Sequence, residues 1–568
     1  MGCLICLILI SNPILGAVIA ASFLAVMYFT IDKKFFYLIV CFFIISAINY
    51  YAYFNINLPK SQKLKVRISD KNNYYCYAKS SNKKIILKGN IFGLTEGRNV
   101  WIRGNFKKMA VYERGIVGTY IVNDYKICNE DLISKIESFR RDLYKKFSVV
   151  LGKEKTALVM AVCFGDSGFI EKTQKEDFKK LGISHVISVS GLHMSIVYKA
   201  LEIISGYKIA LLFSFVYMIF TGGKASTIRA FIMIFILKIA SKIYKKYDSL
   251  SSISLAAIIL LLFRPFYILD IGFMLSFLCV LGIILFNKKI KKVLYKLPKA
   301  LNESFSLSIS SQIFSLPYAV FALKTFSFGF LFSNLLLLPF YTVVVVLGNI
   351  GLVLSGFYEL FNLINYGLYT ILIIIEFIQK NLCIMLPEII YFSCIESLVV
   401  FGLYLCYLGI KSGHRQFKYV PLCVIFVFAY QNYKVFPEIS YISVNNNDIV
   451  LIQYKSDTIA VTTGNINALD LKVPVKVDNV FRGYRGDSTI KLSHRCIIRL
   501  ISHGNKLEAQ VCFLEKSNIK PNLEVFNNTG SEITTYKKNI KLKKDDIYTP
   551  KGTIINKYTI IGNKVLKF

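Results

Sequence analysis

Polar residues are concentrated in one otherwise apolar stretch of the sequence, HVISVSGLHMSIV, at positions 185–197. Ser190 and His193 are three residues apart, about one helical turn, and His185 lies eight residues before His193, so the three side chains can approach one face. Three kinds of site fit these residue types: a serine nucleophile with a histidine base, a metal centre, or a polar strip along a path through a membrane.

The sequence around these residues favours the polar strip over the two alternatives. No GxSxG turn precedes Ser190, although many serine hydrolases hold their nucleophile on such a turn. No cluster of cysteines and histidines has the spacing of zinc ligands, so neither a metal nor a cofactor is expected. Serines and histidines on membrane helices commonly form hydrogen bonds with carbonyl groups or with facing helices. We therefore assign no catalytic residues from the sequence.

The composition indicates that this stretch lies within a membrane protein. Hydrophobic residues make up 54% of the 568 residues, too many for a soluble globule of this size. Apolar runs long enough to cross a bilayer predict nine to twelve spans. These runs lie near 4–30, 35–54, 206–221, 226–242, 250–263, 270–286, 304–323, 327–355, 362–383, 391–410 and 418–433.

Two polar blocks interrupt the apolar runs, and both are built of short alternating segments such as KLKVRI and DIVLIQY, which predict β-strands. An amphipathic segment follows the first block, with Asn129 as its expected N-cap, and should lie on the membrane surface. The predicted fold class is a polytopic α-helical membrane protein with two external β-rich domains. The predicted domains are a hairpin at 1–54, a β domain at 55–128, a surface helix at 129–155, a membrane domain at 156–433 and a β-rich domain at 434–568.

Charge predicts the orientation of the chain and the chemistry of its partner. The formal net charge is +35, which implies an anionic partner such as lipid headgroups or nucleic acid. Basic residues in the short loops at 32–34, 241–248, 287–299 and 409–418 place these loops in the cytoplasm and both β blocks outside the cell.

The first β block has the composition of a surface that binds a single nucleic-acid strand. Residues 60–128 hold 15 Lys or Arg against 4 Asp or Glu, interleaved with aromatic residues. A small barrel whose rings fill its own core is an equally good explanation. Cys76 and Cys128 are the only cysteines of this block and are a candidate disulfide. The candidate DNA-binding residues are Lys83, Lys84, Arg98, Trp101, Arg103, Lys107 and Lys108.

Five polar segments follow one another through the membrane region: CFGDSGFI (163–170), LGISHVISVSGLHMSIV (181–197), TIRAFIM (227–233), LDIGFMLSFLCVLG (269–282) and SSQIFSLPYAVF (310–321). In this order they resemble ComEC, a family of competence membrane proteins that bring DNA into bacteria. The resemblance implies a channel for uptake of single-stranded DNA across the cytoplasmic membrane during natural transformation. The residues that would line the path are Asp166, His185, Ser190, Gly191, His193, Arg229, Ser276 and Gln312.

The resemblance also implies roles for the two β-rich domains and for partners. The first would be OB-like, and the last a degenerate metallo-β-lactamase-like domain. In the latter, VNNND (444–448) and TTG (462–464) remain, but the histidine-rich metal motif is missing and His494 and His503 stand alone, so no nuclease is expected. Expected partners are the lipid bilayer, single-stranded DNA, a cytoplasmic helicase-like ATPase and an external DNA receptor, since the chain has no GxxxxGK[ST] loop of its own, and an oligomer is possible.

Two other functions remain open at this point. A membrane-embedded hydrolase would use Ser190 and His193, and a secondary transporter of a small anion would use Arg229. A repeat of the SGLH or TIRA pattern would favour the transporter, and the sequence has none.

Overall fold

The computed structural model describes residues 2–387 except 12, 56–62, 72–74, 81–82 and 130, then 389–391, parts of 399–419, and the strands between 434 and 567. The chain divides into two compact units. The first comprises residues 1–316 and 327–389, and the second comprises residues 317–326 and 390–568. Each unit is described by itself.

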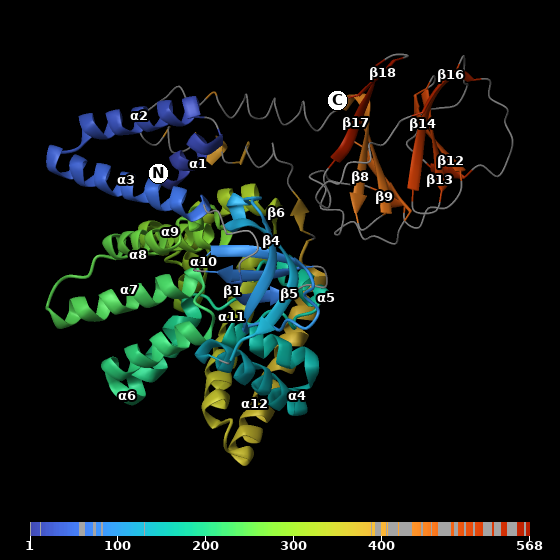
Figure 1. Cartoon of the computed structure of the whole chain (residues 1–568). Helices are drawn as coiled ribbons and strands as arrows, with labels where there is room; N and C mark the ends of the chain where they lie inside the picture. The colour runs from blue at the N-terminus through green and yellow to red at the C-terminus, as the bar shows by residue number, and fades with distance from the viewer. Residues whose placement is uncertain are drawn as a thin grey trace. The chain divides into compact units, whose positions relative to one another are not determined.

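The first β block folds as a closed barrel of five strands, drawn in blue in Figure 1. The strand order is β1-β2-β3-β5-β4, with β4 pairing back onto β1 and a parallel pair between β3 and β5. Alternate residues point inward, as the sequence pattern predicts, and form a core that includes Val66, Ile85 and Ile102. The strands are β1 (Leu64–Lys71), β2 (Cys76–Ser80), β3 (Lys83–Gly89), β4 (Asn99–Lys107) and β5 (Ile116–Ile127), with the 3-10 turn η1 (Tyr112–Arg114) before β5.

Helix α4 (Leu132–Phe164) joins the barrel to the membrane region. Its N-cap is Asp131, whose carboxylate accepts a hydrogen bond from the Ser134 backbone, and not Asn129 as the sequence suggested. The helix changes direction at Gly152, which has φ 74°, and then continues into the apolar segment. The expected surface helix and the start of the membrane domain are therefore one interrupted helix, whose Phe147 is fully buried.

The remaining helices of the first unit are mostly long and apolar. Six helices among the described residues have the length and composition to cross a membrane: α3 (Lys33–Phe54), α6 (Gly191–Phe220), α9 (Ile271–Val293), α10 (Lys299–Leu323), α11 (Phe330–Leu354) and α12 (Tyr358–Met385). The others are α1 (Gly2–Ser11), α2 (Pro13–Thr30), α5 (Lys172–Lys180), α7 (Ala225–Lys242), α8 (Ser249–Phe263) and the 3-10 segment η2 (Pro265–Leu269). The chain is thus a multi-pass membrane protein. The predicted runs at 391–410 and 418–433 lie largely outside the described residues.

The helices α4, α11 and α12 pack together around one apolar core (Figure 1). Close approach depends on Gly348 of α11, because a Cβ there would collide with the Cys163 sulfur on α4. The segment between α5 and α6 also enters this core through Ile183, Val186 and Val189. This packing holds the polar segment 185–197 against α11.

The second unit is β-rich, as predicted for the C-terminal block. Two sheets, with strand orders β11-β10-β9-β8-β17-β18 and β15-β12-β13-β14-β16, share one apolar core. A short pair, β6 (Thr325–Phe326) with β7 (Ile390–Tyr391), belongs to the same unit. The strands are β8 (Lys434–Val444), β9 (Asn447–Lys455), β10 (Asp457–Thr462), β11 (Asn479–Phe481), β12 (Asp487–Ser493), β13 (Cys496–His503), β14 (Lys506–Leu514), β15 (Val525–Asn527), β16 (Tyr536–Lys541), β17 (Ile554–Ile561) and β18 (Lys564–Lys567).

Candidate functional site

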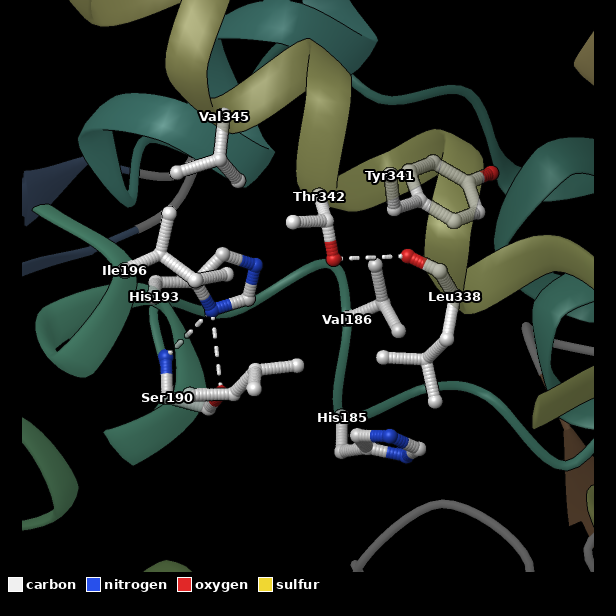
Figure 2. A pocket seen from close by; sticks show the side chains of 10 residues that line it. His185, Val186, Ser190, His193, Ile196, Leu338, Tyr341, Thr342 and Val345 are labelled. Carbon is white, nitrogen blue, oxygen red and sulfur yellow. Dashed lines mark hydrogen bonds between the residues drawn. The ribbon is translucent and has the colours of Figure 1, made fainter. Parts of the chain in front are cut away.

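Ser190 and His193 form a hydrogen-bonded pair at the beginning of α6, as Figure 2 shows. The backbone N–H of Ser190 donates to His193 Nδ1 at 2.9 Å, and the Ser190 hydroxyl lies 2.9 Å from the same nitrogen. Ser190 is the N-cap of the helix, and His193 reaches back to it in the geometry of a capping box. The backbone N–H already occupies the one lone pair of Nδ1, so this nitrogen is a poor base for the hydroxyl. The pair therefore orders the helix end.

A small cavity of about 10 Å³ lies beside this pair. It lies between the 185–190 loop, the first turns of α6 and the middle of α11, and its α11 wall is Leu338, Tyr341, Thr342 and Val345 (Figure 2). The Thr342 hydroxyl donates to the Leu338 carbonyl at 2.9 Å, so α11 itself satisfies this donor. Most of the lining is apolar, and the cavity has room for about one water molecule, far less than a small-molecule ligand needs. Its polar lining residues include His185 and His193, whose imidazole rings are the titratable groups nearest to Ser190.

Arg229 joins three of the polar segments. Its guanidinium donates to the Ser276 carbonyl on α9, lies 5.7 Å from the centre of the Phe277 ring and is buried, with 6% of the residue exposed. A Cβ at Gly191 would lie 2.8 Å from Arg229 Nη2, so a side chain at the start of α6 would displace the guanidinium from this position. Arg229 faces protein, in accordance with the high cost of exposing its charge to lipid.

Hydrogen bonds to backbone carbonyls connect the first and the second polar segments to the residues just before the third. Gly165 ends α4 with φ 76°, and its carbonyl accepts a hydrogen bond from Lys224 Nζ at 3.0 Å. The Ser226 hydroxyl donates to the Val189 carbonyl at 3.1 Å. Asp166 is half-buried and accepts a hydrogen bond from the Gly168 backbone, which closes a local turn. Sequence reasoning missed Lys224, although a lysine directly before the TIRA segment was a visible signal.

Gln312 lies on α10, which packs against α9. Its Oε1 accepts a hydrogen bond from the Ser315 hydroxyl at 3.2 Å. The two helices approach at Gly282, where a Cβ would collide with the Ser310 carbonyl. Of the eight residues expected to line a path, the structure brings Ser190, Gly191, His193, Arg229 and Ser276 together through α6, α7 and α9.

The structure distributes the candidate DNA-binding residues of the barrel over different faces. Trp101, Arg103 and Lys107 alternate outward along β4 and are exposed, whereas Lys83 and Lys84 on β3 face helix α3 and the η2 segment. The list is completed by Arg98, which is half-buried, and Lys108, whose Nζ donates to Asn55 Oδ1 at 2.9 Å.

The proposed disulfide is not formed in the structure. Cys76 is a free thiol in the barrel core, where burial raises its pKa, and Cys128 is a free, half-exposed thiol after β5. The backbone N–H of Cys128 donates to the Asn99 carbonyl at the start of β4.

The C-terminal unit shows no metal ligands among the residues that the structure describes, where no group of three His, Cys, Asp or Glu could hold an ion. Asp448 of the VNNND segment is buried in β9, and Oδ2 accepts a hydrogen bond from the Leu507 backbone at 3.4 Å. Thr462 of the TTG segment is also buried, at the end of β10. His503 ends β13, and His494 lies outside the described residues.

Comparison with known proteins identifies the membrane region. Residues 162–411 match a family model described as Competence protein, and all five polar segments lie within this match. ComE operon protein 3 of Bacillus subtilis (strain 168) is 28% identical over 255 residues, which cover 43% of this chain and 32% of that protein. The similarity thus spans about a third of the length of this curated relative. No solved structure matches.

Proposed function

Because residues 162–411 match the competence protein family, we propose that this chain conducts single-stranded DNA across the bacterial cytoplasmic membrane during natural transformation. The family match is the observation that carries the proposal. It covers the five polar segments, three of which the fold brings together around Arg229 and the start of α6. These segments hold helices together at a polar centre inside an apolar bundle, which is an arrangement suited to a path for a polar substrate.

The β-rich parts receive roles within this proposal. The closed five-stranded barrel fits an OB-like domain that binds the strand outside the cell. The basic short loops support an external position for this barrel and for residues 434–568. The C-terminal domain is proposed to be a degenerate metallo-β-lactamase-like domain that does not cut DNA, so the chain is not an enzyme. A cytoplasmic helicase-like ATPase and an external DNA receptor are the proposed protein partners, and the chain is proposed to oligomerise.

The capping geometry argues against a hydrolase that uses Ser190 and His193. A nucleophile needs a base with a lone pair directed at its hydroxyl, and the Ser190 backbone occupies that lone pair of His193. For the anion transporter, Arg229 would have to face a substrate, yet its guanidinium contacts Ser276, Phe277 and Gly191. Neither alternative therefore has an observation in its favour.

The test is DNA uptake by a strain from which the gene has been deleted. Cells are incubated with DNA labelled on one strand, and label resistant to external nuclease is separated from label bound at the surface. We expect the deletion to abolish internalisation and to retain surface binding, with recovery when the gene is returned. Unchanged internalisation in the deletion strain would refute the proposal.

A further inference from the structure

Three cationic residues stand side by side on the outer surface of the barrel. The strand register places Arg67 of β1 opposite Lys79 of β2, and Lys79 opposite Lys84 of β3. Directly opposite residues have Cβ atoms about 4.5–5.5 Å apart, and like charges in such pairs destabilise a sheet. Repulsion within this row destabilises the folded barrel, so a role of the row in contacts with other parts of the molecule or with a ligand is expected.

A segment between α8 and α9 lies against this row within the same compact unit. The Lys84 ammonium lies 5.0 Å from the centre of the Phe266 ring. Arg264, two residues before Phe266, donates a hydrogen bond to the Tyr267 hydroxyl. Tyr53 of α3 fixes the arrangement, because its hydroxyl accepts from the Lys84 backbone at 3.2 Å and donates to the Gly115 carbonyl at 2.9 Å. The barrel and the segment before η2 thus pack together, and both carry positive charge at this place, Lys79 and Lys84 on the barrel and Arg264 on the segment.

The positive charge in this place is only partly offset by nearby acids. Arg67 pairs with Asp131, but among the described residues no carboxylate forms an ion pair with Lys79 or Lys84. Burial lowers the pKa of Lys79 to about 8, with further lowering by Arg264, Lys84 and Arg67. Burial also lowers the pKa of Lys84, with Arg264 adding to the effect and Asp270 opposing it. An anion bound between Lys79, Lys84 and Arg264 would relieve this repulsion.

Aromatic rings lie on the same outward face of β2. Tyr77 is two residues before Lys79, and its ring packs edge-on against Tyr75 with centroids 5.3 Å apart. Arg114 Nη1 donates to the Tyr77 hydroxyl at 3.3 Å. Rings beside a row of cations are the combination that binds a single strand, because bases stack while phosphates meet the charges. The face formed by the second and third strands is also where OB-type barrels bind oligonucleotides.

We propose that Lys79 and Lys84 of the barrel, together with Arg264 of the segment before η2, form one binding site for a phosphodiester group of single-stranded DNA. The nature of the ligand rests on the proposed function. The site joins the barrel to the membrane helices, so that one phosphate contacts both while the strand passes from one to the other.

The test uses the full chain in nanodiscs of neutral lipid and a fluorescein-labelled thymidine oligonucleotide, with binding followed by anisotropy at several salt concentrations. Lys79→Gln combined with Lys84→Gln should weaken binding by about tenfold or more at low salt, because charged hydrogen bonds to phosphate are lost. The slope of log K against log salt should fall by about 0.7 for each phosphate charge no longer neutralised. Arg264→Gln, in the segment that packs against the barrel, should also weaken binding.

Lys88→Gln is the matched control, since Lys88 is exposed near the far end of the same strand. Affinity and salt slope of the double variant equal to those of Lys88→Gln would overturn the proposal. In a parallel measurement with nanodiscs that contain anionic phospholipid, loss of lipid binding in the double variant with unchanged oligonucleotide binding would also overturn it, and would identify a lipid site. Because the substitutions remove repulsion, the barrel should remain folded, which the fluorescence of Trp101 reports.

Uptake assays separate this proposal from the function on which it rests. If deletion of the gene abolishes DNA internalisation but the Lys79→Gln, Lys84→Gln double variant restores it fully, the site is wrong and the function stands. If deletion leaves internalisation unchanged, the proposed function fails, whatever the binding measurements give.

Discussion

Replacing Lys79 by glutamine should remove a rise in barrel stability at alkaline pH. Its pKa is about 8 in the folded protein against an ordinary value of 10.5, because burial and neighbouring cations disfavour the charged form. Below pH 8 the side chain is protonated in both the folded and the unfolded state. Between these two pKa values it is neutral only in the folded state, so stability increases with pH. From pH 7 to pH 9.5 this amounts to about 2 kcal/mol of unfolding free energy.

The assay is urea unfolding of the full chain in detergent, followed by tryptophan fluorescence. Trp101 is the one tryptophan of the sequence, and it lies on β4 of the barrel, so the signal reports this domain alone. In Lys79→Gln the midpoint should be higher at pH 7 and nearly constant up to pH 9.5, with Lys88→Gln behaving like the unsubstituted protein. A variant that loses stability at pH 7, or that keeps the alkaline rise, would refute the reasoning.

Four further outcomes are expected. Ser190→Asn should retain DNA uptake because asparagine caps helices, whereas Ser190→Ala should lower stability by about 1 kcal/mol; abolished uptake in Ser190→Asn alone would instead indicate a nucleophile. Gly348→Ala should destabilise the α4–α11 packing by about 1–3 kcal/mol and reduce the yield of folded protein, whereas Gly356→Ala, with open space around it, should be neutral. Phosphatase fusions at position 100 and at the C-terminus should both be active, since both positions are expected outside the cell. Silent phosphatase fusions, together with active cytoplasmic reporters at the same positions, would show that the orientation is the opposite one. The purified full chain should contain no stoichiometric zinc or manganese in elemental analysis, and bound metal would disprove the loss of the metal motif.

Alternation of apolar and polar residues was enough to predict the strands of the barrel. In KLKVRI the inward positions are Val66 and Ile68, and both are buried in the structure. The register between strands could not be predicted, because alternation fixes which face a side chain occupies but not its cross-strand partner. The row formed by Arg67, Lys79 and Lys84 depends on that register and was therefore invisible in the sequence.

Apolar runs predicted where membrane helices occur, but they predicted less well where these helices begin and end. The expected span at 206–221 is the second half of α6, which begins at Gly191 and bends at Gly206. Hydropathy places the start too late because the first turns carry His193 and Lys199, whereas the capping pair at Ser190 determines where the helix begins. The same capping accounts for a serine and a histidine three residues apart.

The geometry around Arg229 gives a physical reason for the polar segments. A buried guanidinium needs acceptors, and here it meets the Ser276 carbonyl on α9 and the face of Phe277. It also needs space, which the absence of a side chain at Gly191 provides. Arginine and glycine thus occur in separate segments because one contact requires both, whereas Ser276 contributes only its backbone carbonyl. A path for DNA would run along the surface of this centre, since its interior is filled by the contact itself.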